Sequence, residues 1–110
     1  MRQEEKMRLD RLFFRGRLFD VVKKGKFERV MKWSPENTVY WTGPGRIKIV
    51  VFTGRSKETE EGEWSYEHAV LELDRVPDHI ILEELYEQNE YTYSPLAYDF
   101  YQLLKRKGHI

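Results

Sequence analysis

The sequence contains no cysteine among its 110 residues. Without thiols the chain cannot form disulfides, thiolate–zinc sites or iron–sulfur clusters, and it has no cysteine nucleophile. No stretch approaches the roughly 18 consecutive apolar residues of a membrane-spanning helix, and residues 1–11 lack the apolar segment of a signal peptide. We therefore expect a soluble, cytoplasmic protein with no membrane partner. The length fits a single domain over residues 1–110.

Side-chain amides are also scarce, whereas charged residues make up 35% of the chain. Asparagine occurs twice and glutamine three times, at Asn37, Asn89, Gln3, Gln88 and Gln102. A chain rich in Glu, Lys and Arg and poor in heat-labile amides is typical of hyperthermophile proteins. We expect a thermophilic source, archaeal or viral.

The formal net charge is zero, but the charges are unevenly distributed. Residues 1–57 hold fifteen Lys and Arg against six Asp and Glu, a net charge of +9, and residues 58–110 hold four against thirteen, a net charge of −9. Such asymmetry predicts a basic surface for an anionic partner, or two complementary surfaces on one molecule. The alternative is that folding mixes the two halves, so that their charges neutralise one another in surface ion pairs.

The first part of the chain has a helical pattern. Leu9, Leu12 and Phe13 follow the spacing of one helix face, which predicts a helix over residues 4–15 that Gly16 interrupts. Residues 17–24 suit a helix or a strand equally well. Gly25 fits either the left-handed end of a helix or a hairpin turn.

The middle of the chain alternates as strands do. Residues 27–33, 38–42, 46–53 and 64–73 are rich in β-branched and aromatic residues and are separated by turn residues, with a charged loop expected at 54–63. In the last of these strands, Ala69, Leu71 and Leu73 should share one face.

The C-terminal part is helical again. Ile81, Leu82 and Leu85 predict one helix, which should break at residues 89–93. Ser94 and Pro95 then have the pattern of an N-cap followed by proline at the first helical position, and residues 105–108 should end this last helix. The predicted fold class is α+β: an antiparallel four- or five-stranded meander sheet covered by N- and C-terminal helices.

Motifs for catalysis and cofactors are missing. No serine lies in a Gly-x-Ser-x-Gly elbow, and His68, His79 and His109 are too far apart in sequence for a helical metal pair. The glycine turns at 42–46 and 53–57 match neither the Walker nor the dinucleotide pattern. We expect no catalytic residue, no metal and no cofactor.

Basic residues interleaved with aromatics are the expected footprint of nucleic-acid binding. In the N-terminal half this pattern predicts a nucleic-acid-binding surface with phosphate-contacting cations and base-stacking aromatics. Its members are Lys23, Lys24, Lys26, Arg29, Trp33, Tyr40, Trp41, Arg46, Lys48, Arg55 and Lys57. Core packing is the alternative role for each of these aromatics.

One segment resembles a known family. Residues 18–26, LFDVVKKGK, followed by the strand GRIKIVVF at residues 45–52, are similar to the opening of the ASCH group of PUA-like RNA-binding barrels. The resemblance implies a small barrel that binds RNA. The family's Glu and Arg after the Gly-Lys step are out of register here, where Glu28 and Arg29 come too early.

Two further functions stay open. The acidic, tyrosine-rich C-terminal half could serve a protein partner or a homodimer, since tyrosine is enriched in interfaces and the two halves carry complementary charge. Alternatively, the chain could be a small metal-independent endoribonuclease that uses His68 as acid or base beside Tyr66 and either Lys48 or Arg46.

Overall fold

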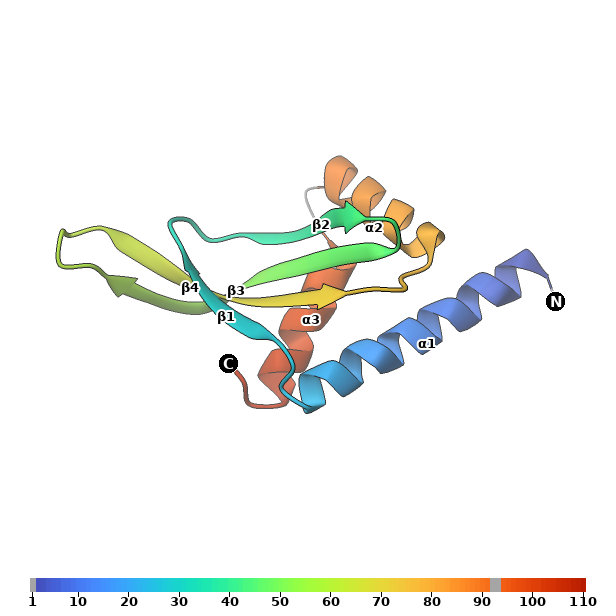
Figure 1. Ribbon diagram of the computed structural model, residues 1–110, viewed down its shortest axis with the longest axis horizontal. Helices are drawn as coiled ribbons and strands as arrows, with labels where there is room; N and C mark the ends of the chain where they lie inside the picture. Colours follow the sequence, from blue (N-terminus) through green and yellow to red (C-terminus); the bar gives the residue numbers. More distant parts are fainter. Residues whose placement is uncertain (1, 92–93) are drawn as a thin grey trace.

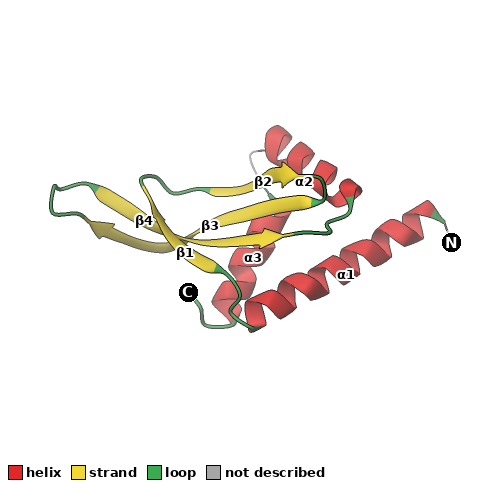
Figure 2. Ribbon diagram, viewed as in Figure 1, coloured by secondary structure: helices red, strands yellow, loops and turns green. Residues whose placement is uncertain are grey.

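In a computed structural model of the chain, residues 2–91 and 94–110 are described (Figure 1). Three helices and four strands follow one another in this part of the chain (Figure 2). Their bounds are α1 (Gln3–Lys23), β1 (Glu28–Lys32), β2 (Asn37–Gly43), β3 (Arg46–Glu58), β4 (Trp64–Leu73), α2 (Asp78–Tyr91) and α3 (Pro95–Arg106). The predicted α+β class is confirmed.

The four strands form one antiparallel sheet in the order β1-β4-β3-β2. The meander therefore covers β2, β3 and β4 alone, because β1 pairs with β4 instead of β2. The connection between β1 and β2 crosses the sheet rather than turning a hairpin: the Glu36 backbone N–H donates to His68 Nε2 on β4, at 3.0 Å. A crossing of this kind leaves both β1 and β2 as edge strands.

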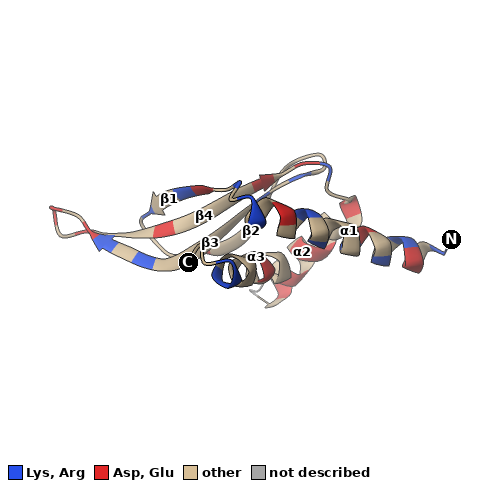
Figure 3. Cartoon of the chain, turned by 90° about the horizontal axis from the view of Figure 1, so that it is seen from below, with Lys and Arg blue, Asp and Glu red and all other residues tan. Residues whose placement is uncertain are grey.

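The core lies between one face of the sheet and the helices. The strands contribute apolar side chains from alternate positions, as their period of two requires. Helices α2 and α3 contact the sheet, and α1 packs against α3. Ala69, Leu71 and Leu73 share this face, as predicted, and pack with residues such as Phe14 and Phe100. The helices thus form a second layer on one side of the sheet, as Figure 3 shows.

Helix α1 is longer than predicted, because Gly16 lies inside it and residues 17–23 are helical. Phe14, Leu18 and Val22 explain this continuity: the three are spaced four apart, lie on both sides of the glycine and are all buried. Burial of this stripe outweighs the roughly 1 kcal/mol that glycine costs within a helix.

The expected loop over residues 54–63 is also shorter than predicted. Strand β3 continues to Glu58, and Lys57 and Glu58 pair with Ser65 and Trp64 of β4. Backbone pairing does not require apolar side chains, so the charges here did not end the strand. The result is a long hairpin that extends from the body of the sheet (Figure 1).

The C-terminal helices follow the prediction closely. Helix α2 continues to Tyr91, three residues into the predicted break, and Thr92 and Tyr93 of that break lie outside the described residues. Ser94 is the N-cap of α3, and its hydroxyl oxygen accepts from the Ala97 backbone N–H at 3.1 Å.

Candidate nucleic-acid interface

Six Lys and Arg side chains gather where α1 and α3 end. We call this cluster the basic end, and every member is exposed. Three members follow from the sequence prediction and three come from the otherwise acidic C-terminal half. They are Lys23, Lys24, Lys26, Lys105, Arg106 and Lys107. In Figure 3 the last turns of both helices are blue.

Direct contacts join the two halves of the basic end. His109 Nε2 donates to the Val22 carbonyl at 2.9 Å, and the His109 ring meets Phe27 edge-on, with centroids 5.0 Å apart. Lys107 Nζ lies 4.6 Å from the centroid of the Phe19 ring. Because these contacts hold the segment after α3 against the segment after α1, the two sets of cations share one surface.

Both helices end in the same way, with a glycine in the left-handed conformation. Gly25 has φ 69° and Gly108 has φ 79°. Their N–H groups donate to the carbonyls of Val22 and Lys105, at 3.0 and 3.2 Å, as in a Schellman cap. Cations in the last turn also interact favourably with the negative end of the helix dipole, by about 0.3–1 kcal/mol each. The basic end therefore has a structural role in addition to any binding role.

A few carboxylates border the basic end. Asp20 accepts from Lys24 Nζ at 2.8 Å, and this hydrogen bond, with the charges of the nearby lysines, lowers the pKa of Asp20. Glu28 and Glu72 line a shallow pocket together with Lys26. These three carboxylates are fewer than the six cations, so this surface has an excess of positive charge.

Arg29, the nearest predicted cation on the sheet, is held by contacts within the molecule. Its guanidinium forms an ion pair with Glu67 at 3.1 Å and donates to the His109 carbonyl at 2.7 Å. The same group lies 5.4 Å from the centroid of the Phe27 ring. Arg29 thus ties the C-terminal segment to β1 and β4.

Tyr40 and Lys48 lie side by side on the sheet face opposite the helices. Lys48 Nζ is 5.6 Å from the Tyr40 ring centroid, and the Tyr40 hydroxyl donates to Glu36 at 3.1 Å. Burial raises the pKa of Tyr40, and the bond to Glu36 adds to that effect. Lys32 Nζ lies 3.3 Å from the same Glu36 carboxylate. The positive charge on this face is therefore partly neutralised.

The other predicted residues lie apart from the basic end. Trp41 and Trp33 are 59% and 70% exposed, so neither belongs to the core. Arg46 begins β3 and lines a pocket with Glu72 and Asp74. In a molecule with extents of 59 × 30 × 22 Å, the predicted residues thus form several separate groups.

Arg55 and Lys57 lie on the β3–β4 hairpin, close to its acidic tip. The tip carries four glutamates, at Glu58, Glu60, Glu61 and Glu63. Arg55 also lies 3.9 Å from the Glu67 carboxylate. This hairpin therefore presents mixed charge and not a basic surface.

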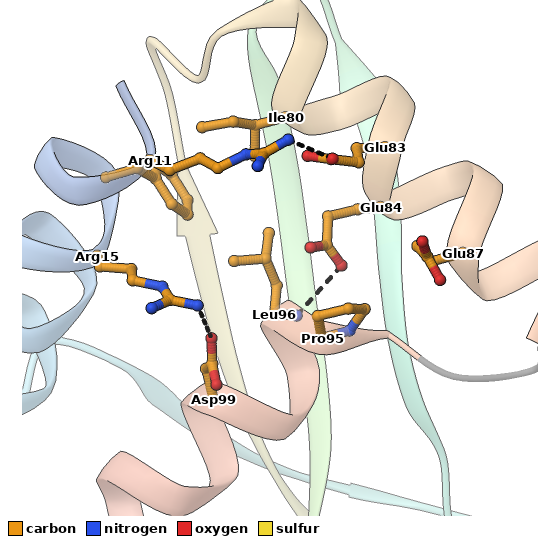
Figure 4. Close-up of a pocket in the computed structure, with 10 residues that line it drawn as sticks. Arg11, Arg15, Ile80, Glu83, Glu84, Glu87, Pro95, Leu96 and Asp99 are labelled. Atoms are coloured by element: carbon orange, nitrogen blue, oxygen red, sulfur yellow. Dashed lines mark hydrogen bonds and ion pairs between the residues drawn. The ribbon is translucent and has the colours of Figure 1, made fainter. Parts of the chain in front are cut away.

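Part of the charge asymmetry between the two halves is taken up by ion pairs between them. Arg15 of α1 lies 3.9 Å from Asp99 of α3, and Arg17 lies 3.4 Å from Asp74 (Figure 4 shows the first pair). Arg11 forms an ion pair with Glu83 of α2 in the same close-up. The interpretation that folding mixes the halves thus holds for Arg11, Arg15 and Arg17 of α1, whereas none of the basic-end cations pairs with a carboxylate of the other half in the ion pairs described.

Glu84 is the buried carboxylate of a pocket of about 220 Å³ between the three helices (Figure 4). Its Oε2 accepts from the Ser94 hydroxyl and the Leu96 backbone N–H, both at 3.1 Å. Burial raises the pKa of Glu84, although these two hydrogen bonds act in the opposite direction. Because the carboxylate caps the start of α3, its position has a structural explanation.

His68, the residue on which the ribonuclease alternative depends, is fully buried. Nδ1 donates to the Tyr66 carbonyl at 2.8 Å, and Nε2 accepts from the Glu36 N–H. This pattern is that of a neutral ring with its proton on Nδ1. Both ring nitrogens are occupied, so the ring has no free atom for acid–base chemistry.

Comparisons with known proteins add no relative. No protein-family model, curated protein or solved structure matches the chain. The segment similar to PUA-like barrels ends α1 here, and the sheet is open between its edge strands. Among the described residues, no helix has the length and hydropathy needed to cross a bilayer.

Proposed function

We propose that this protein binds nucleic acid through the basic end, without catalysing a reaction. The supporting observation is the meeting of six exposed cations from two helix ends that are far apart in sequence. Cationic side chains that contact phosphates supply most of the sequence-independent affinity for nucleic acids. A surface with an excess of cations over carboxylates has the charge that such binding requires.

The distribution of the cations favours a polymer over a single phosphate group. Lys26 and Arg106 line two different shallow pockets, one beside β4 and one between α1 and α3. A ligand that reaches both must carry several negative charges along its length. The exposed side chains of Lys24, Lys105 and Lys107 extend the same surface.

A direct test compares two sets of three charge reversals. The first set removes part of the basic end: Lys26→Glu, Lys105→Glu and Arg106→Glu. The matched control makes the same change in net charge on the sheet: Arg46→Glu, Arg55→Glu and Lys57→Glu. Binding is measured by fluorescence anisotropy with labelled single-stranded and duplex RNA and DNA, at about 50 and 200 mM salt, a range over which phosphate contacts strongly change affinity.

We expect the first set to weaken binding at least about tenfold and to reduce the slope of log K against log salt by about 2 to 3, because each phosphate contact contributes roughly 0.7 to 0.9. The control set should have a clearly smaller effect. An equal loss in both sets would show that net charge alone matters. Absence of binding by the wild-type protein at 50 mM salt would refute the proposal, and thermal melts of both variants check that they are folded.

A further inference from the structure

Helix α1 carries an apolar stripe on the side that faces away from the core. We call it the α1 seam: Leu9, Leu12, Gly16 and Phe19. Leu9, Leu12 and Phe19 are 50%, 60% and 40% exposed. Their spacing of three, four and three residues is that of a heptad seam, by which two helices pack against each other.

The buried residues of α1 are separate from this seam, and Gly16 and Phe19 of the seam also border the pocket between α1 and α3. Phe14, Leu18 and Val22 are the buried residues of α1, and residues 2–13 contribute none. Isolated helices shorter than about 12 to 15 residues are marginal in water, so helical segments in proteins depend on packing for stability. The first half of α1 therefore presents apolar side chains without a partner to pack against.

We propose that the α1 seam pairs with the α1 seam of a second copy of this chain, with the two helices antiparallel. When the two antiparallel seams are aligned at their midpoints, Leu9 of one copy lies opposite Phe19 of the other, and Leu12 lies opposite Gly16. A Cβ added at Gly16 would have no neighbour within 4 Å. The side chain of Leu12 from the second copy occupies this open space, so that a large residue packs against the small Gly16.

Charged residues at the ends of the seam favour a second copy in this orientation. The same heptad spacing continues to Glu5 and Lys23, so an antiparallel pair places each glutamate opposite a lysine. On one flank, Lys6 lies opposite Asp20, and Phe13 meets its own copy near the two-fold axis. A parallel pair would instead place Glu5 opposite Glu5 and Lys23 opposite Lys23, which is unfavourable.

The other flank brings Arg15 close to Arg15 of the second copy. Each of these arginines has a carboxylate partner within its own chain, Asp99 at 3.9 Å. That ion pair reduces the repulsion between them. Two members of the basic end border the seam, since Lys23 continues its spacing and Lys107 Nζ lies 4.6 Å from the centroid of the Phe19 ring. The two basic ends would lie at opposite ends of the helix pair.

The first test is the mass in solution over a range of protein concentrations, measured by sedimentation equilibrium. The wild-type chain should approach twice its monomer mass of 13.4 kDa. Leu12→Lys should raise the dissociation constant about tenfold or more, because both copies lose a buried leucine. Leu82→Lys is the matched control: Leu82 is 67% exposed on α2, outside the seam, and its replacement should leave the mass unchanged. A wild-type chain that stays monomeric at every concentration overturns the proposal.

The second test fixes the orientation and uses the absence of cysteine from the native chain. Leu9→Cys and Phe19→Cys are prepared as separate proteins and oxidised alone and mixed. An antiparallel pair should give a disulfide-linked dimer only in the mixture, since equal positions are then about 15 Å apart along the axis, beyond the roughly 7 Å limit between Cα atoms. A disulfide in either protein alone indicates a parallel pair and overturns the proposed arrangement, and none in the mixture excludes the seam. Neither test depends on nucleic-acid binding, so this inference and the proposed function can fail separately.

Discussion

The first and last helices of this molecule are built in opposite ways. Helix α3 buries Leu96, Phe100 and Leu104, and Ser94 caps its first turn. Helix α1 is nearly twice as long, yet no side chain caps its first turn, and apolar residues lie on two opposite faces. The apolar stripe of α3 is buried within its own chain, whereas α1 carries a second apolar face that its own chain does not cover.

This difference teaches that apolar spacing alone does not identify the core face of a helix. Leu9, Leu12 and Phe13 predict the first helix from the sequence, yet all three are exposed. The residues that do reach the core are Phe14 and Leu18, together with Val22. A second apolar stripe on a helix is therefore a reason to look for a second partner.

The largest expected effect on stability tests the burial of α3 against the exposure of the first half of α1. Phe100→Ala should lower the free energy of unfolding by about 3 to 5 kcal/mol, because it leaves a cavity where the side chain is fully buried. Phe13→Ala, at a position 73% exposed, should change it by less than about 0.5 kcal/mol in the dilute chain. Urea denaturation of both variants measures the difference, and equal losses would contradict the burial of α3 and the exposure of α1.

A smaller effect concerns the carboxylate at the start of α3. Because burial raises the pKa of Glu84, the folded state takes up a proton more readily than the unfolded state. This carboxyl group should therefore contribute stability to the wild type as the pH falls from neutral through its raised pKa toward the ordinary value of 4.5. Glu84→Gln keeps an oxygen acceptor and should lack this gain.

Denaturation of the wild type and of Glu84→Gln at several pH values between about 7 and 4.5 checks this prediction. Glu84→Ala is the companion variant, because it leaves the Leu96 N–H without its partner and should cost about 1 to 3 kcal/mol at any of these pH values. If the difference in the free energy of unfolding between wild type and Glu84→Gln did not depend on pH, the pKa of Glu84 would not be raised by burial.

The smallest expected effect on stability concerns Gly16, which lies inside α1 and in the α1 seam. Gly16→Ala should raise the free energy of unfolding of the dilute monomer by about 0.5 to 1 kcal/mol, because alanine favours a helix and its Cβ meets nothing within 4 Å. The same methyl group fills the space proposed for Leu12 of a second copy, so it should weaken pairing. Helix content at low concentration and sedimentation at high concentration measure the two effects, and a variant that pairs better than the wild type would argue against a seam centred here.

Much of the fold follows from local signals in the sequence. Ser94 and Pro95 mark the start of the last helix, and the alternation around Ala69 and Leu71 marks the core face of β4. The partner of β1 could not be predicted, because strand alternation gives a face but no neighbour. The length of α1 could not be predicted either, since packing across the chain decides whether Gly16 ends the helix.

The basic end could be predicted only in part. Lys23, Lys24 and Lys26 stand out in a basic segment, whereas residues 105–107 have the pattern of a helix stop within an acidic half. Only the fold brings the two sets together, through contacts such as that between His109 and Val22. Counting charges in each half of the sequence cannot show that these two sets of cations lie side by side.

The packing of α1 on α3 also bears on how the chain is made. A ribosome synthesises residues 3–23 well before residues 95–106, the helix that covers their apolar side. Until then Phe14, Leu18 and Val22 have no α3 to pack against, and the nascent chain exposes apolar surface. Folding of this part of the chain therefore waits for the synthesis of residues 95–106, and a chaperone that binds apolar helices would meet α1 before α3.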